Sequence, residues 1–494
     1  MTDAEVRQEA ESVRDDERQQ PGRGRLVLTA ALLGFFMICL DATAINVALP
    51  AIGRSLGEAT SGLQWVVDGY TVPFAALLIS AGAVSDRLGA RRVFGWGLVV
   101  FAAASAGCGL APGLPVLIAT RVVQGGAAAV MLPSSLALVR QAFADPVARA
   151  RAVAVWTSGG AAAIAAGPVL GGILTSTVGW RTIFLANLPV GAAALAVLVL
   201  RAPRSPRLAA PLDPAGQVTA VLGLAALTFG VITGGSDGFA RPSALTALVV
   251  AALAGGCFLA VESRVVRPMV PLALFRSPVV VTCVVTGFSI NAAFYGVAFV
   301  LSLYFQRVLG EPAITAGLMF LPMTGLLTLA TLVSARVAAR WGHHVPVRAG
   351  LCAGMLGMLL LAFLHGRVGM EIALVPAGAG LGFALPSLTF LLLDSLPVAQ
   401  AGLAGGLFNA GRQTGGALAV ATFGTLVSGS FMTGMRVSML ISVALLLFST
   451  VAACTVFRRR EPANQGVAQG AGEDGGSMRS LSRTQQSTIF GLGP

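Results

Sequence analysis

Residues 82–89 read GAVSDRLG, and residues 335–342 read ARVAARWG; each is a short junction with charged residues that follows a long apolar run. The second octapeptide begins 253 residues after the first and shares a valine, an arginine and a glycine with it. Further matches at the same offset are Gly34-Phe35 with Gly287-Phe288, Gly125 with Gly378, and Leu132-Pro133-Ser134 with Leu385-Pro386-Ser387. One offset that aligns several segments predicts an internal repeat.

The composition between these junctions is that of a membrane protein. The mean hydropathy is +0.82 and only 11% of the residues are charged, against roughly 25% in soluble domains. Apolar runs of about 20 residues recur, and each can cross a hydrocarbon core of about 30 Å as a helix. The predicted spans lie near 26–48, 63–81, 93–111, 115–139, 152–176, 183–201, 215–234, 243–261, 279–305, 313–335, 347–365, 370–393, 402–428 and 435–457. We therefore predict an all-α integral membrane protein with about fourteen helices.

The repeat divides these spans into two six-helix halves with the same orientation in the membrane. Two such halves bind substrate between them, near the middle of the bilayer. The remaining two spans form an insertion between the halves. The predicted organisation is a cytoplasmic disordered tail at 1–25, an N-terminal half at 26–201, a linker with two inserted helices at 202–277, a C-terminal half at 278–457 and a second disordered tail at 458–494.

The net charge of +12 follows the membrane topology. Every basic residue is an arginine, and most arginines flank the ends of spans on the side of the amino terminus. Those predicted on the other side are Arg54, Arg181, Arg241, Arg307, Arg367 and Arg436. This asymmetry predicts a multi-pass protein of the cytoplasmic membrane with both termini in the cytoplasm. It also argues against a nucleic-acid partner, and we expect a monomer.

Enzymatic and cofactor chemistry find no support in the sequence. The six cysteines are scattered singly along apolar runs, which favours neither disulfides nor a metal site. A phosphate-binding loop of the form GxxxxGK[ST] cannot occur in a chain without lysine. We expect no catalytic residue, no metal and no cofactor, with the proton gradient as the energy source.

Ionisable residues inside the predicted spans are the main functional candidates, because each is costly at membrane depth. Asp41, Asp68 and Arg121 all fall roughly 8–12 Å below the outer surface when counted at about 1.5 Å per residue. They can pair, which leaves one acid free to exchange a proton, or Arg121 can simply neutralise an acid to hold helices together. Their partners in the repeat are apolar, namely Phe294, Leu321 and Leu374. The second half thus packs without these charges, which favours the functional interpretation.

Three further charges lie near or inside spans of the second part of the chain. Arg412 can face the region between the halves or extend toward the cytoplasm. Glu262 and Asp394 lie at predicted cytoplasmic span ends, where we expect them to be solvated.

In six of its motifs the chain resembles the major facilitator superfamily, specifically its fourteen-helix drug:proton antiporter family. The motifs that carry the resemblance are LDATAINVALP at 40–50, GAVSDRLGARR at 82–92, RVVQGGAAA at 121–129, GGAAAIAAGPVLGG at 159–172, WRTIFLANLPVG at 180–191 and LDPAGQ at 212–217. The resemblance implies the major facilitator fold. It further implies proton coupling at Asp41, influenced by Arg121, with Asp68 as a second candidate.

The resemblance also implies roles for the other motif residues. The junction motif is expected to gate the cytoplasmic face through Gly82, Asp86, Arg87, Gly89, Arg91 and Arg92. The equivalent segment of the second half has Ala339 in place of Asp86, so we do not expect the same gating contact in both halves. Gly167, Pro168, Gly171 and Gly172 belong to a motif typical of exporters. Candidates to line the substrate cavity are Asn46, Gln124, Asn291 and Arg412.

The sequence thus predicts a proton-driven exporter of small lipophilic or cationic compounds that works by alternating access. Three alternatives remain open at this point. The chain can be a dedicated exporter of one self-made metabolite, a proton-coupled importer of a solute, or a membrane sensor without transport.

Overall fold

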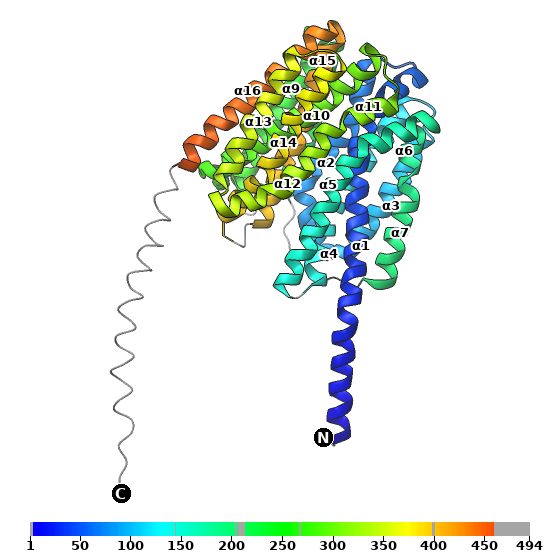
Figure 1. The fold of residues 1–494 in the computed structure, drawn as a ribbon, viewed down its shortest axis with the longest axis vertical. Coiled ribbons are helices and arrows are strands. Elements are labelled where there is room, and N and C mark those ends of the chain that lie inside the picture. The colour runs from blue at the N-terminus through cyan, green and yellow to red at the C-terminus, as the bar shows by residue number, and fades with distance from the viewer. Residues whose placement is uncertain are drawn as a thin grey trace, which may run out of the picture.

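The computed structural model describes residues 3–143, 145–202, 205, 213–265, 268–397 and 401–458. Every regular element in these ranges is helical (Figure 1). The first part of the chain contains α1 (Asp3–Leu56), α2 (Thr60–Leu88), α3 (Ala90–Gly109), α4 (Leu114–Ala142), α5 (Pro146–Thr177), α6 (Arg181–Leu185) and α7 (Asn187–Arg201). The inserted pair is α8 (Pro214–Asp237) and α9 (Pro242–Arg264). The second part contains the short 3-10 helix η1 (Leu272–Arg276), α10 (Pro278–Leu303), the π-helical turn η2 (Tyr304–Val308), α11 (Ala313–Met319), α12 (Leu321–Trp341), α13 (His344–Phe363), α14 (Gly366–Asp394), α15 (Ala401–Gly429) and α16 (Phe431–Arg458).

Thirteen segments of the described chain are long and apolar enough to cross a membrane. The 29-residue helix α15 is not among them, because it carries Asn409, Arg412 and Gln413 near its middle. It nevertheless packs inside the bundle, between α10, α2 and α16. The predicted all-α membrane fold with about fourteen helices is confirmed.

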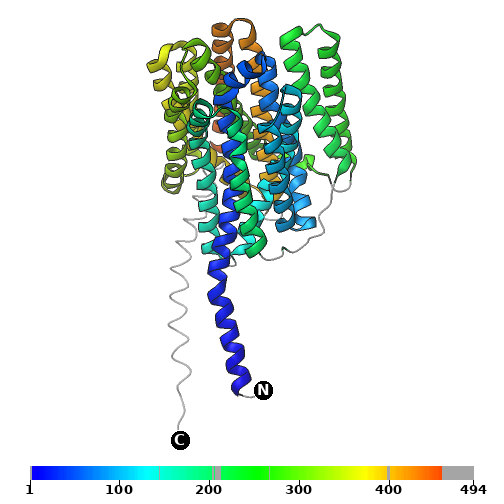
Figure 2. The ribbon, with the colours of Figure 1, turned by 90° about the vertical axis from the view of Figure 1, so that its right-hand side faces the viewer.

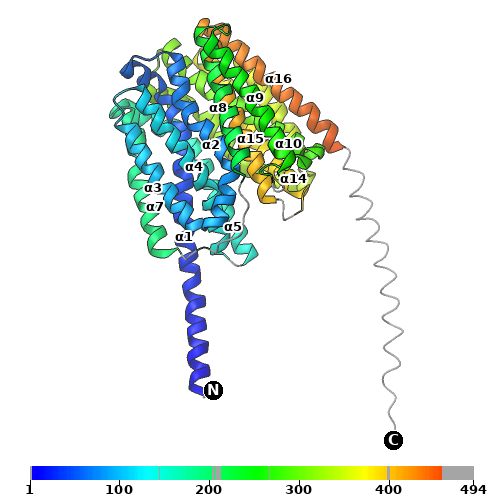
Figure 3. The same cartoon turned by 180° about the vertical axis from the view of Figure 1, so that it is seen from behind.

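The inserted helices α8 and α9 pack against each other at one edge of the bundle (Figure 2). Gln217 of α8 donates a hydrogen bond to the Ala76 carbonyl of α2 at 2.8 Å, and Thr425 of α15 donates one to the Val231 carbonyl of α8 at 3.3 Å. The pair therefore contacts one helix of each half (Figure 3).

Equivalent glycines show the repeat in the backbone itself. Gly57 and Gly310 have φ angles of 72° and 73°, and Gly89 and Gly342 have φ angles of 92° and 83°. Glycine adopts such positive angles without the steric cost that other residues meet. Each pair ends equivalent helices, so the offset of 253 residues relates matching turns.

The same offset relates two close helix contacts. A Cβ atom on Gly125 of α4 would collide with the Tyr70 carbonyl oxygen of α2, and one on Gly378 of α14 would collide with the Met323 carbonyl oxygen of α12. Small residues at such crossings let two membrane helices approach backbone to backbone. The repeat therefore extends from the sequence to individual contacts.

We predict that Gly125→Ala lowers the thermal unfolding temperature of the purified protein by several degrees. The new methyl group meets backbone, which cannot move aside, and overpacking of this kind costs about 1–3 kcal/mol. Gly126→Ala is the matched control, because its Cβ would lie 3.4 Å from a flexible Leu77 methyl group, an ordinary contact. Equal melting temperatures for the two variants would contradict this packing argument.

Two sequence-based expectations differ from the structure. Helix α1 begins at Asp3, whereas we expected a disordered tail over 1–25. Residues 3–20 are rich in Ala, Glu, Gln and Arg, which favour helix. Glu262 is only 3% exposed rather than solvated, because the chain after α9 folds back and the Val270 N–H donates to its carboxylate at 3.0 Å. The tail predicted at 458–494 lies outside the described residues, apart from Arg458.

The two halves join at the end of the bundle opposite the amino terminus. Gln64 of α2 donates to the Ala421 carbonyl of α15 at 2.6 Å, and Gln306 of η2 donates to the Val47 carbonyl of α1 at 2.8 Å. Ser302 of α10 likewise donates to the Asn46 carbonyl. Nearer the middle of the bundle, Thr328 of α12 donates to the Ala161 carbonyl of α5 at 3.3 Å. These side chains hold the halves together through backbone oxygens of the opposite half.

Toward the amino-terminal end, α2 and α15 separate. Near the joined end, a Cβ on Gly424 would overlap the Gln64 side chain. Farther along, a Cβ on Gly406 would lie 4.0 Å from Ile79, and at Gly82 and Gly405 it would meet nothing within 4 Å. The ribbons diverge in the same direction (Figure 1). The halves are therefore joined at one face of the membrane domain, and α2 and α15 lie farther apart toward the other.

Candidate functional site

A buried ion pair lies in the first half. Asp41 of α1 and Arg121 of α4 have side chains that are at most 1% exposed, and 2.5 Å separates the Asp41 Oδ2 and Arg121 Nη1 atoms. Arg121 also donates through Nε to the Val66 carbonyl of α2 at 3.0 Å. The pair thus ties three helices together at membrane depth, where each charge alone would be costly.

Two amide side chains complete the surroundings of the carboxylate. Gln124 and Asn187 donate to the Asp41 Oδ1 atom at 3.1 Å and 3.0 Å. Both also donate to the Ser105 hydroxyl, at 3.3 Å and 3.0 Å, and Ser105 donates to the Phe184 carbonyl at 2.8 Å. A buried polar network of this kind is stable only because nearly all its members have partners.

Asn187 was not among the site residues predicted from the sequence. It lies in the motif WRTIFLANLPVG, where it is the one polar residue from position 183 to 191. An amide flanked by apolar residues at membrane depth was the available signal.

Aromatic rings cover the guanidinium of Arg121. Its Cζ atom lies 4.3 Å from the centre of the Tyr70 ring and 5.7 Å from that of Phe184. A cation over an aromatic face gains about 2 kcal/mol when both are desolvated. Tyr70 is 2% exposed, and its hydroxyl has no hydrogen-bond partner in the described chain.

Asp68 of α2 lies apart from this network. It is fully buried, and neither carboxylate oxygen has a hydrogen-bond partner among the described residues. The neighbouring residue Gly69 faces Arg121 instead, because a Cβ atom on Gly69 would lie 3.5 Å from the Arg121 Cβ atom. Asp68 follows Gln64 by one helical turn, so it lies on the face of α2 that packs against α15. The structure therefore brings Asp41 and Arg121 together but not Asp68.

The predicted exporter motif in α5 makes two different contacts. A Cβ on Gly167 or Gly171 would collide with Thr43 or Ala44 of α1, within the same half. Gly172 faces the backbone of α11 instead, and Gly317 of α11 packs on the Pro168 carbonyl. Half of this motif thus belongs to the interface that joins the two halves.

We predict that Gly172→Val shifts the protein toward a conformation in which the joined face is open. A Cβ here would lie 2.6 Å from the Ala313 carbonyl oxygen and 3.0 Å from the Ile314 Cα atom, so α5 and α11 must move apart. A cost of about 1–2 kcal/mol changes a two-state ratio by roughly 5- to 30-fold. The measurement is the alkylation rate of Ala48→Cys in a cysteine-free background.

Ala48 is fully buried on α1 beside the joined face, so its accessibility reports opening. Gly256→Val is the matched control, because a Cβ at that position meets nothing within 4 Å. An alkylation rate that Gly172→Val leaves at the control value would show that this crossing does not hold the face closed.

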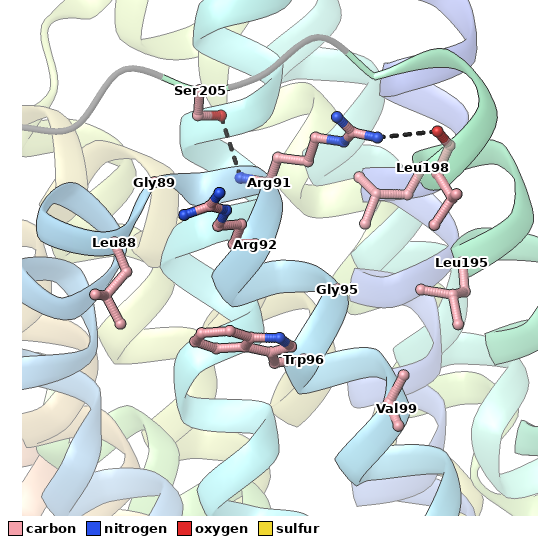
Figure 4. A pocket seen from close by; sticks show the side chains of 11 residues that line it. Leu88, Gly89, Arg91, Arg92, Gly95, Trp96, Val99, Leu195, Leu198 and Ser205 are labelled. Carbon is pink, nitrogen blue, oxygen red and sulfur yellow. Dashed lines mark hydrogen bonds between the residues drawn. The ribbon is translucent and has the colours of Figure 1, made fainter.

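The junction motif lies at the end where α2 and α15 diverge. Asp86 and Arg87 are exposed and form no ion pair with another described residue. Arg91 donates to the Val199 carbonyl at 2.9 Å, and its backbone N–H donates to Ser205 at 3.1 Å, beside a cavity of about 730 Å³ (Figure 4). Arg92 and Gly89 line the same cavity. Among the described residues, these hydrogen bonds of the motif stay within its own half and the linker, so its gating role stays a prediction.

The candidates for a substrate cavity lie in different surroundings. Asn46 is 3% exposed and donates to the Ala42 carbonyl of its own helix at 3.1 Å, and Gln124 belongs to the Asp41 network. Asn291 of α10 and Arg412 of α15 are hydrogen-bonded to each other at 3.1 Å. They form a second polar site, separate from the ion pair.

Two bundles joined at one face, with an ion pair buried in one of them, define a secondary transporter of the membrane. The chain belongs to the Major Facilitator Superfamily, whose family model matches residues 31–420. Within it, the chain falls among drug-efflux proteins, as the relatives below show. The predicted family is thus confirmed.

Curated relatives align with most of this chain. It is 37% identical over 407 residues to the methylenomycin A resistance protein of Streptomyces coelicolor, covering 81% of this chain and 85% of that one. It is 35% identical to the multidrug resistance protein Stp of Mycobacterium tuberculosis (82% and 76%). It is 34% identical to the tetracenomycin C resistance and export protein of Streptomyces glaucescens (82% and 76%). The solved nucleoside transporter NupG shares the fold, with a TM-score of 0.60 at 15% identity over 87% of this chain and all of NupG.

Proposed function

We propose that this protein is a proton-coupled antiporter that exports small lipophilic compounds from the cytoplasm by alternating access. The observation that carries the proposal is the buried Asp41–Arg121 pair. A buried carboxylate that is paired with one arginine depends on that pair for its charge. It stays ionised while the pair is intact and takes up a proton when the pair opens.

The network gives that opening a structural route. Arg121 touches α2 through the Val66 carbonyl and the Tyr70 ring, and α2 carries both Asp68 and the contact with α15. Movement of α2 against α15 therefore changes the surroundings of Arg121 and of Asp68 together. Asp68, buried without a partner, is costly as an anion, and proton uptake removes that cost. We assign proton exchange to these two acids.

The arrangement of the halves supports alternating access. The hydrogen bonds of Gln64 and Gln306 join the halves at one face, and α2 and α15 diverge toward the other. The arginine asymmetry supports a cytoplasmic position for the amino terminus and for the face at which α2 and α15 diverge. The conformation is then the one that receives cargo from the cell, and closure would bring Gly82 toward Gly405.

Export rather than uptake is favoured by the three relatives described above, which are named as resistance or export proteins. One proton that moves inward down 100 mV supplies about 2.3 kcal/mol, enough for a roughly fiftyfold gradient of a neutral compound. A dedicated exporter of one metabolite is the second candidate, because relatives are named for single compounds, such as tetracenomycin C and cephamycin.

The test is accumulation of two dyes, cationic ethidium and acidic 1-pyrenebutyrate, in inverted vesicles with an acidified interior. We expect at least one dye to accumulate and to leave again when an uncoupler collapses the gradient. If neither dye moves but tetracenomycin C does, the dedicated exporter is the correct function. If no compound follows the gradient in either direction, the antiport proposal is wrong.

A further inference from the structure

Arg412 is a half-buried cation without a counter-ion. It lies in α15, and its Nε and Nη1 atoms donate to the side-chain oxygens of Asn291 and Asn409, at 3.1 Å and 3.2 Å. Both acceptors are neutral amides. No carboxylate of the described chain forms an ion pair with Arg412, and its Nη2 atom makes no hydrogen bond there. A guanidinium at this depth normally has an anionic partner.

Arg412 is oriented toward the region between the halves. Its Cγ atom packs on α10, 3.0 Å from where a Cβ of Gly287 would lie. The guanidinium interacts electrostatically with the Tyr295 phenol of α10 and with the Cys39 thiol of α1, in the opposite half. It therefore does not extend away toward the cytoplasmic end of α15, which was the alternative that the sequence left open.

Tyr295 of α10 adds a phenol to these surroundings, because its electrostatic interactions are with Arg412 and Cys39. A phenol O–H can donate to an anion. The site thus combines a guanidinium nitrogen that has no hydrogen-bond partner in the described chain with a neighbouring hydroxyl group.

The acids of the first half are not placed to bind a cationic cargo. Asp41 is already paired with Arg121 and accepts hydrogen bonds from two amide side chains. Asp68 is fully buried on the face of α2 that packs against α15. Of Asp41, Asp68, Arg121 and Arg412, only Arg412 is both partly accessible and without an opposite charge among the described residues.

We propose that Arg412, with Tyr295, binds the acidic group of a lipophilic anion. The preferred cargo then carries a carboxylate or a comparable acidic oxygen, a narrower class than the lipophilic or cationic compounds expected from the sequence. This inference rests on the proposed export function and names the cargo class for it. An arginine fork matches a planar carboxylate, and a charge-assisted hydrogen bond of this kind is among the stronger ones.

The cargo charge has a consequence for energetics. Export of one monovalent anion for one proton taken up moves two positive charges inward. Each charge contributes about fiftyfold per 100 mV, so the limiting gradient of an acidic cargo is roughly 2,500-fold. Export of a neutral cargo for one proton moves only one charge, so its limiting gradient is about fiftyfold.

The experiment compares 1-pyrenebutyrate with its methyl ester, which has the same apolar body without the charge. Binding of each to the full chain in lipid nanodiscs is measured by fluorescence, with empty nanodiscs subtracted. We expect Arg412→Gln to weaken binding of the acid about tenfold or more and that of the ester less than twofold, as for loss of one charged hydrogen bond. Arg412→Lys should retain part of the preference, because it keeps the charge but not the fork.

Arg436→Gln is the matched control, because Arg436 donates only to the Ala362 carbonyl, at 3.4 Å, and stacks on Phe363. Equal affinities of the wild type for acid and ester, or equal losses of both in a folded Arg412→Gln variant, would overturn the inference. Proton-driven accumulation of either dye would still uphold the export function in that case. Arg412-dependent binding of the acid without any proton-driven transport would support the inference about the cargo and contradict the export function.

Discussion

Asp41→Asn is expected to abolish proton-driven accumulation, leaving inverted vesicles at the level of those without the protein. The amide cannot release or take up a proton in the physiological range. It also cannot hold Arg121 through a charged pair at 2.5 Å. Because the coupled step requires both, gradient-driven transport should be lost while downhill exchange of dye continues. The measurement is accumulation with and without the gradient, in the same vesicles.

The same substitution should destabilise the protein. It leaves Arg121 fully buried without a counter-ion, and breaking a buried pair in this way costs about 3–5 kcal/mol. The double variant Asp41→Asn with Arg121→Gln removes the stranded charge. We expect it to recover most of the thermal stability but none of the gradient-driven transport.

The two variants together separate coupling from folding. If the double variant accumulates dye as the wild type does, the pair is only a structural clamp. Asp41→Glu provides the complementary case, because it keeps an exchangeable carboxyl group and should retain partial transport.

The fold could be predicted from the sequence because its determinants are local. Apolar run length fixes the number of spans, and arginine placement predicts their orientation. The repeat at 253 residues was readable because equivalent turns and crossings need glycine, as at Gly89 with Gly342 and Gly125 with Gly378. Counting helical rise also placed Asp41 and Arg121 at one depth, where the structure shows them in contact.

Depth along a helix does not give rotation about its axis, and this is why Asp68 could not be placed. Asp68 shares the layer of Asp41, yet its side chain lies on a different face of α2 from the Gly69 position that meets Arg121. Asn187 and Glu262 depend on packing between distant segments. Their partners, Asp41 and Val270, come from another helix and from the linker. Such contacts leave no periodic signal in a single sequence.

Asp68→Asn should behave differently from Asp41→Asn, and the contrast is the sharpest test of the two assignments. Asp68 has no hydrogen-bond or ion-pair partner in the described chain, so its replacement strands no other charge. We expect the thermal unfolding temperature to stay within a few degrees of the wild type. We also expect gradient-driven accumulation to fall at least tenfold, because the asparagine resembles the protonated acid and cannot release a proton.

The conformation of this variant provides an independent measurement. A permanently neutral side chain removes the cost of a buried anion against α15, so the joined face should open less often than in the wild type. Alkylation of Ala48→Cys should therefore slow down in Asp68→Asn, opposite to the increase expected for Gly172→Val. Asp237→Asn, at the exposed end of α8, is the matched control for loss of one acid. Wild-type transport and wild-type alkylation in Asp68→Asn would mean that Asp68 plays no part in coupling, and proton exchange would then rest on Asp41 alone.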